Sequence, residues 1–168
     1  GGGAGLLASV LDSNCKPSSH VIYEPIKSNY DRVRSQKLLP STTVHNYAVV
    51  GPDSDDTTLK FRIRERVFGS GFLSDGAISI ESDKVIEVPT IAIKSVLEND
   101  FDIILMDVEG YEEVLLPAIV TLSQALIIFE YHNDKCSLDL SDLFALCPNY
   151  TFTHFTDCTF VGVPRSKK

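Results

Sequence analysis

Two short apolar runs, each followed by a pair of polar residues, constrain the fold of this chain more than any other feature. The runs and their polar pairs are residues 103–106 with Asp107 and Glu109, and residues 126–129 with Glu130 and His132. Continuous apolar runs of this length are typical of strands buried on both faces of a parallel sheet. Because ligands bind beyond the carboxyl ends of such strands, the two polar pairs are the main functional signal.

Strand-like and helical segments alternate along most of the chain. Helices are expected directly after the opening glycines, after Pro25, and over residues 91–97, 111–122 and 138–146, with further strands over residues 21–24 and 43–50. Pro117 lies inside the fourth of these helices, so we expect a kink or an early break there. Residues 150–155 and 158–163 are expected to pair as an antiparallel hairpin. The pattern predicts an α/β fold with a mostly parallel sheet flanked by helices and an antiparallel C-terminal edge.

The stretch over residues 59–89 differs from the rest of the chain. Short β-like runs at residues 59–63, 77–80 and 85–88 are separated by glycine-containing loops. This pattern predicts a β-rich, antiparallel insertion in an otherwise single domain that covers residues 1–168.

Composition and charge narrow the choice of partners. The net charge is −8, and the one basic stretch, residues 60–66, alternates charged with apolar residues as a solvated strand face does. We therefore expect no nucleic-acid partner. No apolar run approaches the length of a membrane span, so no membrane partner is expected either. The four cysteines form no C-x-x-C pair, which favours free thiols and a cytoplasmic location.

A glycine run at the start of the chain and a carboxylate after the next strand form a second signal. Gly1, Gly3 and Gly5 precede a helix, and Glu24 ends a short apolar run. Glycines let backbone amides approach a nucleotide-type cofactor, and a carboxylate at this place accepts hydrogen bonds from ribose hydroxyls. The alternatives are a flexible terminus or cloning remnant for the glycines and a helix-terminal acid for Glu24. Leu6 stands where the dinucleotide fingerprint requires a glycine, which disfavours an NAD-dependent oxidoreductase.

The polar pairs after the two buried strands offer acid–base chemistry. Asp107 and Glu109 point the same way if the strand continues through them, although a carboxylate here could also cap the next helix. Glu130 and His132 have the same spacing, and His132 could be a general base or a structural histidine. Three carboxylates and a histidine could hold a divalent cation, but we expect no resident metal. The histidines interpreted as structural are His20, His45 and His154.

These residues give the chain a resemblance to the FkbM-type methyltransferases, which depend on S-adenosylmethionine. The glycine run resembles their first motif, and residues 22–25 resemble their acidic second strand. More specific are residues 88–92, the motif Asp-Val-Glu-Gly-Tyr-Glu at residues 107–112, and the strand ending in Glu-Tyr-His at residues 130–132. The resemblance covers nearly the whole chain. It implies a Rossmann-like methyltransferase sheet and methyl transfer, usually to a hydroxyl on a sugar, polyketide or similar small molecule.

The resemblance also implies roles for individual residues. The residues placed at the S-adenosylmethionine cofactor are Gly1, Gly3, Gly5, Glu24, Ala48 and Asp107, with Ala48 near the adenine. The residues placed around the reacting centre are His132, Asp107, Glu130 and Glu109. Of these, His132 or Asp107 is expected to accept the proton of the acceptor hydroxyl, Glu130 to orient the site, and Glu109 to lie on the acceptor side. The expected partner is a small-molecule or carbohydrate acceptor.

One difference from the family concerns the first strand. In the family a complete strand precedes the glycine motif, whereas this sequence starts at Gly1, so the first strand is apparently missing. The strands beside its slot would then present unpaired backbone groups. We expect sheet rearrangement or self-association to satisfy them, with a homodimer favoured. The alternative function is a non-catalytic methyltransferase-like binding or assembly module.

Overall fold

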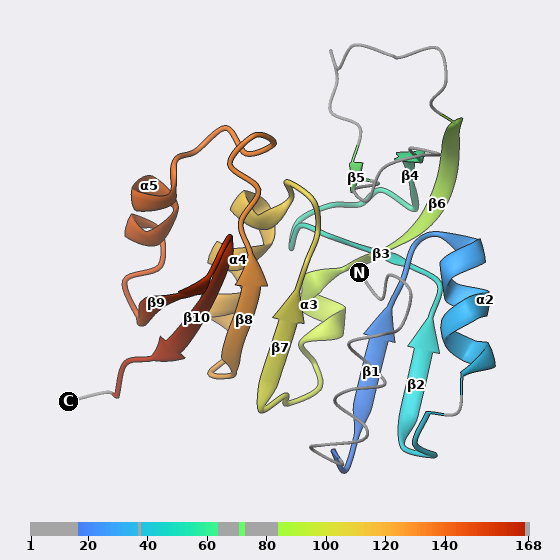
Figure 1. Cartoon of the computed structure of the whole chain (residues 1–168), viewed down its shortest axis with the longest axis horizontal. Helices are drawn as coiled ribbons and strands as arrows, with labels where there is room; N and C mark the ends of the chain where they lie inside the picture. Colours follow the sequence, from blue (N-terminus) through green and yellow to red (C-terminus); the bar gives the residue numbers. More distant parts are fainter. Residues whose placement is uncertain (1–16, 37, 64–70, 73–83, 167–168) are drawn as a thin grey trace. The chain divides into compact units, whose positions relative to one another are not determined.

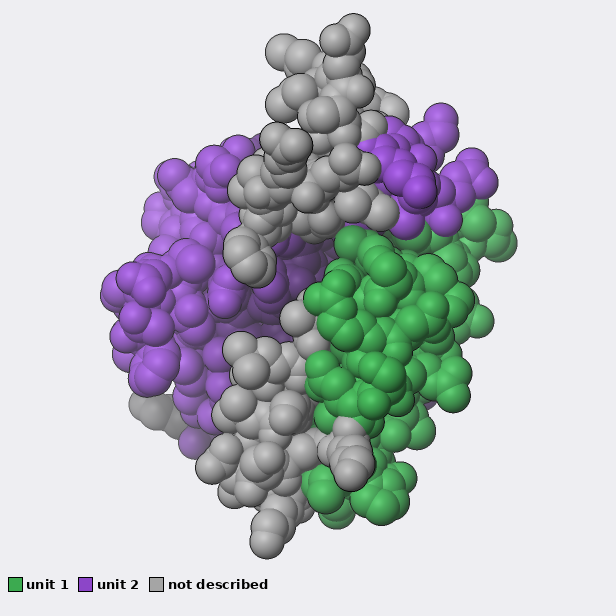
Figure 2. Space-filling view, turned by 45° about the vertical axis from the view of Figure 1, so that its right-hand side comes forward, with its two compact units in different colours: residues 1–49, 56–59, 88–91 green, residues 50–55, 60–87, 92–168 purple. Residues whose placement is uncertain are grey.

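The structure, a computed structural model, describes residues 17–36, 38–63, 71–72 and 84–166. Within these ranges the chain has a mixed α/β fold whose strands form three sheets (Figure 1). It divides into two compact units, shown in separate colours in Figure 2. Unit 1 comprises residues 1–49, 56–59 and 88–91, and unit 2 comprises residues 50–55, 60–87 and 92–168. The interpretation of residues 1–168 as a single domain stays a prediction.

Unit 1 contains a strand–helix–strand element. Strand β1 (His20–Tyr23) pairs in parallel with β2 (Thr42–His45), and helix α2 (Lys27–Ser35) connects them. Ile22 of β1 and Val33 of α2 are buried against each other, and Leu38 and Val44 pack on this pair. The apolar face expected after Pro25 therefore holds α2 against the two strands.

The strand expected over residues 43–50 is two strands, so that prediction was wrong. Strand β2 ends at His45, and β3 (Ala48–Val50) belongs to a different sheet. Asn46 separates them because its side-chain Nδ2 donates to the carbonyl oxygens of Glu24 and Pro25, both at 2.9 Å. These two bonds reach backbone groups more than twenty residues away in sequence.

A second sheet has the strand order β3-β6-β4-β5. Its members are β4 (Thr58–Ile63), β5 (Gly71–Phe72) and β6 (Lys84–Ala92), in addition to β3. Strands β4 and β5 pair antiparallel, while the run at residues 77–80 lies outside the described residues. Strand β6 continues through Ala92, so α3 (Ile93–Val96) is shorter than the helix expected over residues 91–97.

The main sheet of unit 2 has the order β7-β8-β10-β9. Strands β7 (Ile103–Met106) and β8 (Leu126–Glu130) are parallel and are joined by helix α4 (Glu112–Leu122). Strand β10 (Thr159–Pro164) is antiparallel to both β8 and β9 (Tyr150–Thr156). This confirms the antiparallel C-terminal hairpin, whose turn places Asp157 at a φ of 44°. The last helix, α5 (Leu140–Ala145), begins at an N-cap, Asp139, that accepts from the N–H of Asp142 at 2.9 Å.

Helix α4 covers the β7–β8 pair with an apolar face that is fully buried. The buried apolar side chains of this helix and of β8 are Leu115, Leu116, Ile119, Val120, Ile127 and Phe129. Phe129 also packs edge-on against Phe144 of α5 and Phe152 of β9, and stacks on Phe160 of β10. Burial of each such side chain contributes about 1.5–3 kcal/mol, so Ile127 and Phe129 anchor β8 in the core. The expected break at Pro117 does not occur, because α4 is helical through that residue.

The fold class is therefore α/β, but the described strands do not establish one mostly parallel sheet. Two pairs are parallel, β1–β2 and β7–β8, and the other pairings with a described register are antiparallel. Among the described residues, no helix is both long and apolar enough to cross a membrane.

Candidate active site after strands β7 and β8

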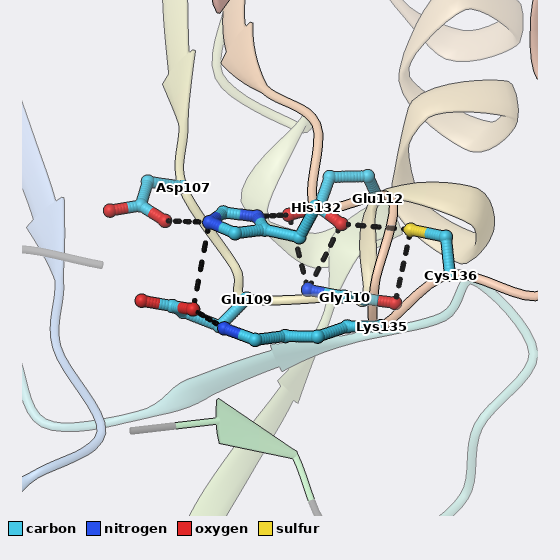
Figure 3. A network of polar contacts seen from close by, with 7 residues as sticks. All are labelled: Asp107, Glu109, Gly110, Glu112, His132, Lys135 and Cys136. Atoms are coloured by element: carbon cyan, nitrogen blue, oxygen red, sulfur yellow. Dashed lines mark hydrogen bonds and ion pairs between the residues drawn. The ribbon is translucent and has the colours of Figure 1, made fainter. Parts of the chain in front are cut away.

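The carboxyl ends of β7 and β8 lie at the same edge of their sheet because the strands are parallel. Met106 is in register with Phe129, so Asp107 and Glu130 follow at the same level. Strand β7 ends at Met106, so Asp107 and Glu109 lie in the loop before α4 and not on a continuing strand. The side chain toward which they converge is His132, two residues beyond β8 (Figure 3).

The imidazole of His132 is the centre of this polar network. Its Nε2 lies 3.9 Å from Asp107 Oδ1 and 3.5 Å from Glu109 Oε2. Its Nδ1 lies 2.9 Å from Glu112 Oε1, which is a good hydrogen-bond distance. The His132 side chain is 16% exposed, so the ring is mostly enclosed but can still be reached by a ligand.

The loop between β7 and α4 has an unusual backbone. Glu109 has a φ of 55° and Gly110 a φ of 108°. A side chain at position 110 would also meet Lys135, whose Cβ would be 2.6 Å from an added Cβ. Glycine is therefore required here both by its φ and by the close approach of the 132–136 turn. The carboxylate of Glu109 lies toward Nε2 of His132, whereas the N–H of Gly110 donates to Glu112, the residue at Nδ1 (Figure 3).

Glu112, the first residue of α4, is fully buried. Its oxygens accept from the N–H of Gly110 at 3.0 and 3.2 Å and lie near His132 Nδ1 and, at 3.2 Å, the Sγ of Cys136. Sequence reasoning included Glu112 in the motif but gave it no role in the site. The signal that could have found it is a carboxylate at the start of an apolar helix, where burial demands specific partners.

The turn after His132 supplies two further members of the network that sequence reasoning missed. The N–H groups of Lys135 and Cys136 donate to His132 O at 2.9 and 3.0 Å, which folds the chain back over the loop before α4. This places the ammonium of Lys135 in an ion pair with Glu109. No residue pattern indicates these contacts, because they depend on how the turn closes.

The two strand-end acids, Asp107 and Glu130, have raised pKa values. Burial raises the pKa of Asp107, and the nearby charge of Glu109 raises it further, while His132 acts in the opposite direction. Burial also raises the pKa of Glu130, with the charge of Asp107 as the next cause. Raised pKa values at a cluster of convergent groups are a mark of functional sites.

Three residues of the site are spaced so that they could together hold a divalent cation. Ligand atoms of Asp107, Glu130 and His132 all lie within 4.8 Å of one another. Lys135 already brings a positive charge to the same cluster through its ion pair with Glu109. The expectation of no resident metal stays a prediction.

The comparison with protein families decides the identity of the domain. The model described as "Methyltransferase FkbM domain" matches residues 5–153, which is most of the chain. The chain belongs to the FkbM methyltransferase family. Neither the curated proteins nor the solved structures gave a match. The resemblance inferred from residues 107–112 and 130–132 is thus confirmed, and both segments fall inside the matched region.

Of the residues assigned to the cofactor, Asp107 belongs to the network around His132. The others lie elsewhere in the chain. Glu24, at the end of β1, is 3% exposed, and its Oε1 accepts from the N–H of Ile26 at 2.9 Å. Ala48 is buried at the start of β3. The glycines at positions 1, 3 and 5 lie outside the described residues. The cofactor roles of these five residues and of Asp107 stay predictions.

The other histidines have local contacts that suit a structural role. His45 stacks on Tyr23 with 5.1 Å between the ring centroids. His154 lies 5.1 Å from the ring of Phe160, and its Nε2 is 2.9 Å from Asp157 O. Neither is part of the network around His132.

Proposed function

We propose that this FkbM domain is an S-adenosylmethionine-dependent O-methyltransferase that acts on a hydroxyl of a small-molecule or carbohydrate acceptor. The observation that carries the proposal is the environment of His132 inside a methyltransferase family match. Nδ1 of this histidine is engaged by the buried carboxylate of Glu112, while Nε2 is directed at the carboxylates of Asp107 and Glu109. A histidine held in this way has one nitrogen available for proton transfer at the edge of a sheet where ligands bind.

The chain's own residues would activate the acceptor. When bound, S-adenosylmethionine supplies a methyl group on a positively charged sulfur, so no covalent enzyme intermediate is needed. His132 Nε2 takes the proton of the acceptor hydroxyl as the oxygen forms its bond to the methyl carbon and the bond from that carbon to sulfur breaks. General-base assistance of this kind typically contributes about 10²–10⁴-fold. Asp107 is the other proton acceptor within reach.

The acidic residues would then position the reactants. Glu130, whose carboxylate lies beside the carboxylate of Asp107 and the imidazole of His132, would orient the acceptor, and Glu109 would lie on the acceptor side. Holding the acceptor oxygen in line with the methyl group supplies much of the rate of such a transfer. Side-chain carboxylates are suited to both tasks because they accept hydrogen bonds from hydroxyls.

The second part of the proposal is that the protein binds a nucleoside-type cofactor, and it is supported by the place of Glu24. Glu24 is a buried carboxylate at the carboxyl end of β1, which is the kind of acceptor that ribose hydroxyls require. We propose that Glu24, Ala48, Asp107 and the glycines at positions 1, 3 and 5 contact the cofactor, within a Rossmann-like arrangement of the strands. A homodimer and a cytoplasmic location are part of the same proposal.

Binding calorimetry tests the cofactor assignment. We expect the protein to bind S-adenosylmethionine and its demethylated product, S-adenosylhomocysteine, and Glu24→Gln to weaken both. Asp31→Asn, a change at an exposed residue of α2 that pairs with Lys27, is the matched control and should bind like the parent. A protein that binds neither compound at high micromolar concentration would contradict the proposal and favour a non-catalytic module.

A further inference from the structure

Glu112 is buried where a carboxylate destabilises the fold unless its oxygens accept hydrogen bonds. Its side chain is 0% exposed, and burial of a carboxylate without partners costs several kcal/mol. The position at the start of α4 offsets part of this cost, because the N-terminus of a helix favours negative charge. The remainder has to come from the three groups that contact its oxygens.

Two of these groups, the N–H of Gly110 and the thiol of Cys136, are hydrogen-bond donors to the carboxylate. The Gly110 N–H donates to Oε2 at 3.0 Å, and it can only donate. The Cys136 Sγ lies 3.2 Å from the same oxygen and 3.7 Å from Gly110 O. Burial, followed by the hydrogen bond to Glu112, raises the pKa of Cys136 to about 12, so its thiol keeps its proton. Glu112 therefore faces donors at Oε2.

The third group is the His132 ring, and its contact with Glu112 decides which ring nitrogen carries the proton. An ionised Glu112 can only accept at Oε1, 2.9 Å from Nδ1, so Nδ1 carries the ring proton opposite this carboxylate. In the neutral ring the lone pair is then on Nε2. This is the nitrogen that lies 3.9 Å from Asp107 and 3.5 Å from Glu109, where the acceptor is proposed to bind.

We propose that Glu112 is the positioning residue that holds His132 in the tautomer protonated at Nδ1 and so makes Nε2 the base of the methyl transfer. This inference rests on the proposed function. In the step it serves, the O–H bond of the acceptor breaks and its proton moves to Nε2. The positively charged ring is then stabilised by the buried carboxylate at Nδ1. Glu112 touches neither the acceptor nor the donor.

Glu112→Gln is the test because the amide can satisfy only one set of partners. With its oxygen at the Oε2 position, the glutamine accepts from Gly110 and Cys136 but turns its NH₂ toward Nδ1 of His132. The opposite orientation would set the NH₂ closer to the Gly110 N–H, at 3.0 rather than 3.2 Å, and would also set it 3.2 Å from the Cys136 thiol, which is a donor here. The first orientation is therefore favoured, and it requires Nδ1 to be an acceptor. The ring proton should then move to Nε2.

The readout is the nitrogen NMR spectrum of the His132 ring, which distinguishes a protonated from an unprotonated nitrogen. In the parent protein, at a pH where the ring is neutral, the unprotonated nitrogen should be Nε2. In Glu112→Gln it should be Nδ1, and kcat should fall about 10²–10⁴-fold with little change in KM. Glu113→Gln, a change one residue along the same helix, contacts Ser137 and not the ring, so it should leave the tautomer and kcat as in the parent.

Each outcome supports or overturns the inference. A parent protein with its ring proton on Nε2 overturns it, and that measurement does not require the variant to fold. A folded Glu112→Gln that keeps the Nδ1–H tautomer and the parental kcat also overturns it. The spectrum is recorded without donor or acceptor, so failure to bind S-adenosylmethionine refutes the proposed function and leaves the tautomer result to be judged by itself.

Discussion

Gly110 lies so close to Lys135 that a Cβ at position 110 would be 2.6 Å from the Lys135 Cβ and 3.3 Å from its carbonyl oxygen. This contact locks the loop that follows β7 against the turn that follows His132. The two segments carry most of the polar network, so the geometry around the ring depends on a contact between backbones.

Gly110→Ala should therefore destabilise the protein by about 1–3 kcal/mol, because the φ of 108° and the contact with Lys135 both exclude a side chain. The measurement is the free energy of unfolding in urea. Gly51→Ala is the control, since its nearest neighbour is a side-chain atom, Val114 Cγ1, at 3.1 Å. A loss no greater than that of Gly51→Ala would show that the contact does not constrain the loop.

His132→Ala should lower kcat on an identified acceptor by about 10²–10⁴-fold, as expected for loss of a general base. The affinity for S-adenosylmethionine should change little, because the ring is assigned to the acceptor. His154→Ala, in the C-terminal hairpin, is the matched control and should keep the parental rate. If His132→Ala and Asp107→Asn both turn over at near-parental rates, neither is the base and the proton must leave to solvent.

The stability of the fold should depend on pH through Glu113. Burial by itself would raise the pKa of this carboxyl, but hydrogen bonds from the N–H of Leu138 and from the hydroxyl and N–H of Ser137 hold the pKa below its ordinary 4.5. A pKa that is lower in the folded than in the unfolded state stabilises the fold above the ordinary value. This contribution is lost as pH falls through the lowered pKa.

Glu113→Gln removes that titration, so its unfolding free energy should fall less than the parent's when the pH is lowered from neutral to below 4.5. Urea unfolding at several pH values measures the difference. Identical pH dependence in the two proteins would mean that these hydrogen bonds do not lower the pKa.

Much of the candidate site follows from the sequence, but its buried half does not. Buried parallel strands place the residues after them at one edge, so Asp107, Glu109, Glu130 and His132 could be expected to meet. The roles of Glu112 and Lys135 depend on how the 132–136 turn folds back. The spacing of apolar residues in the sequence does not predict the path of this turn. Their contacts join residues 20 and 26 positions apart in sequence.

The fold was predictable to a similar degree. The C-terminal hairpin and the β7–α4–β8 unit follow from alternation and apolar runs. The division of residues 43–50 into two strands does not, because it depends on Asn46 bonding to two distant carbonyls. Strand β6 likewise extends through Pro89 to Ala92, where the apolar spacing had indicated a helix.

The site should work without a metal ion. Because Nε2 of His132 is assigned to proton transfer, turnover should survive dialysis against a chelator. An excess of Zn²⁺ should inhibit, since the spacing of Asp107, Glu130 and His132 would let the ion occupy that nitrogen. Loss of activity with chelator and its recovery with Mn²⁺ would instead make these three residues metal ligands.

The most direct test of the proposed function is to measure methyl transfer to an acceptor. The protein is incubated with methyl-labelled S-adenosylmethionine and a panel of hydroxylated small molecules and carbohydrates, and the product is identified by mass and by its stability to base. We expect label in a base-stable methyl ether, and its formation should drop in His132→Ala. Label found in a base-labile methyl ester or on nitrogen, or formed equally well by His132→Ala, would contradict methylation of a hydroxyl with His132 as the base.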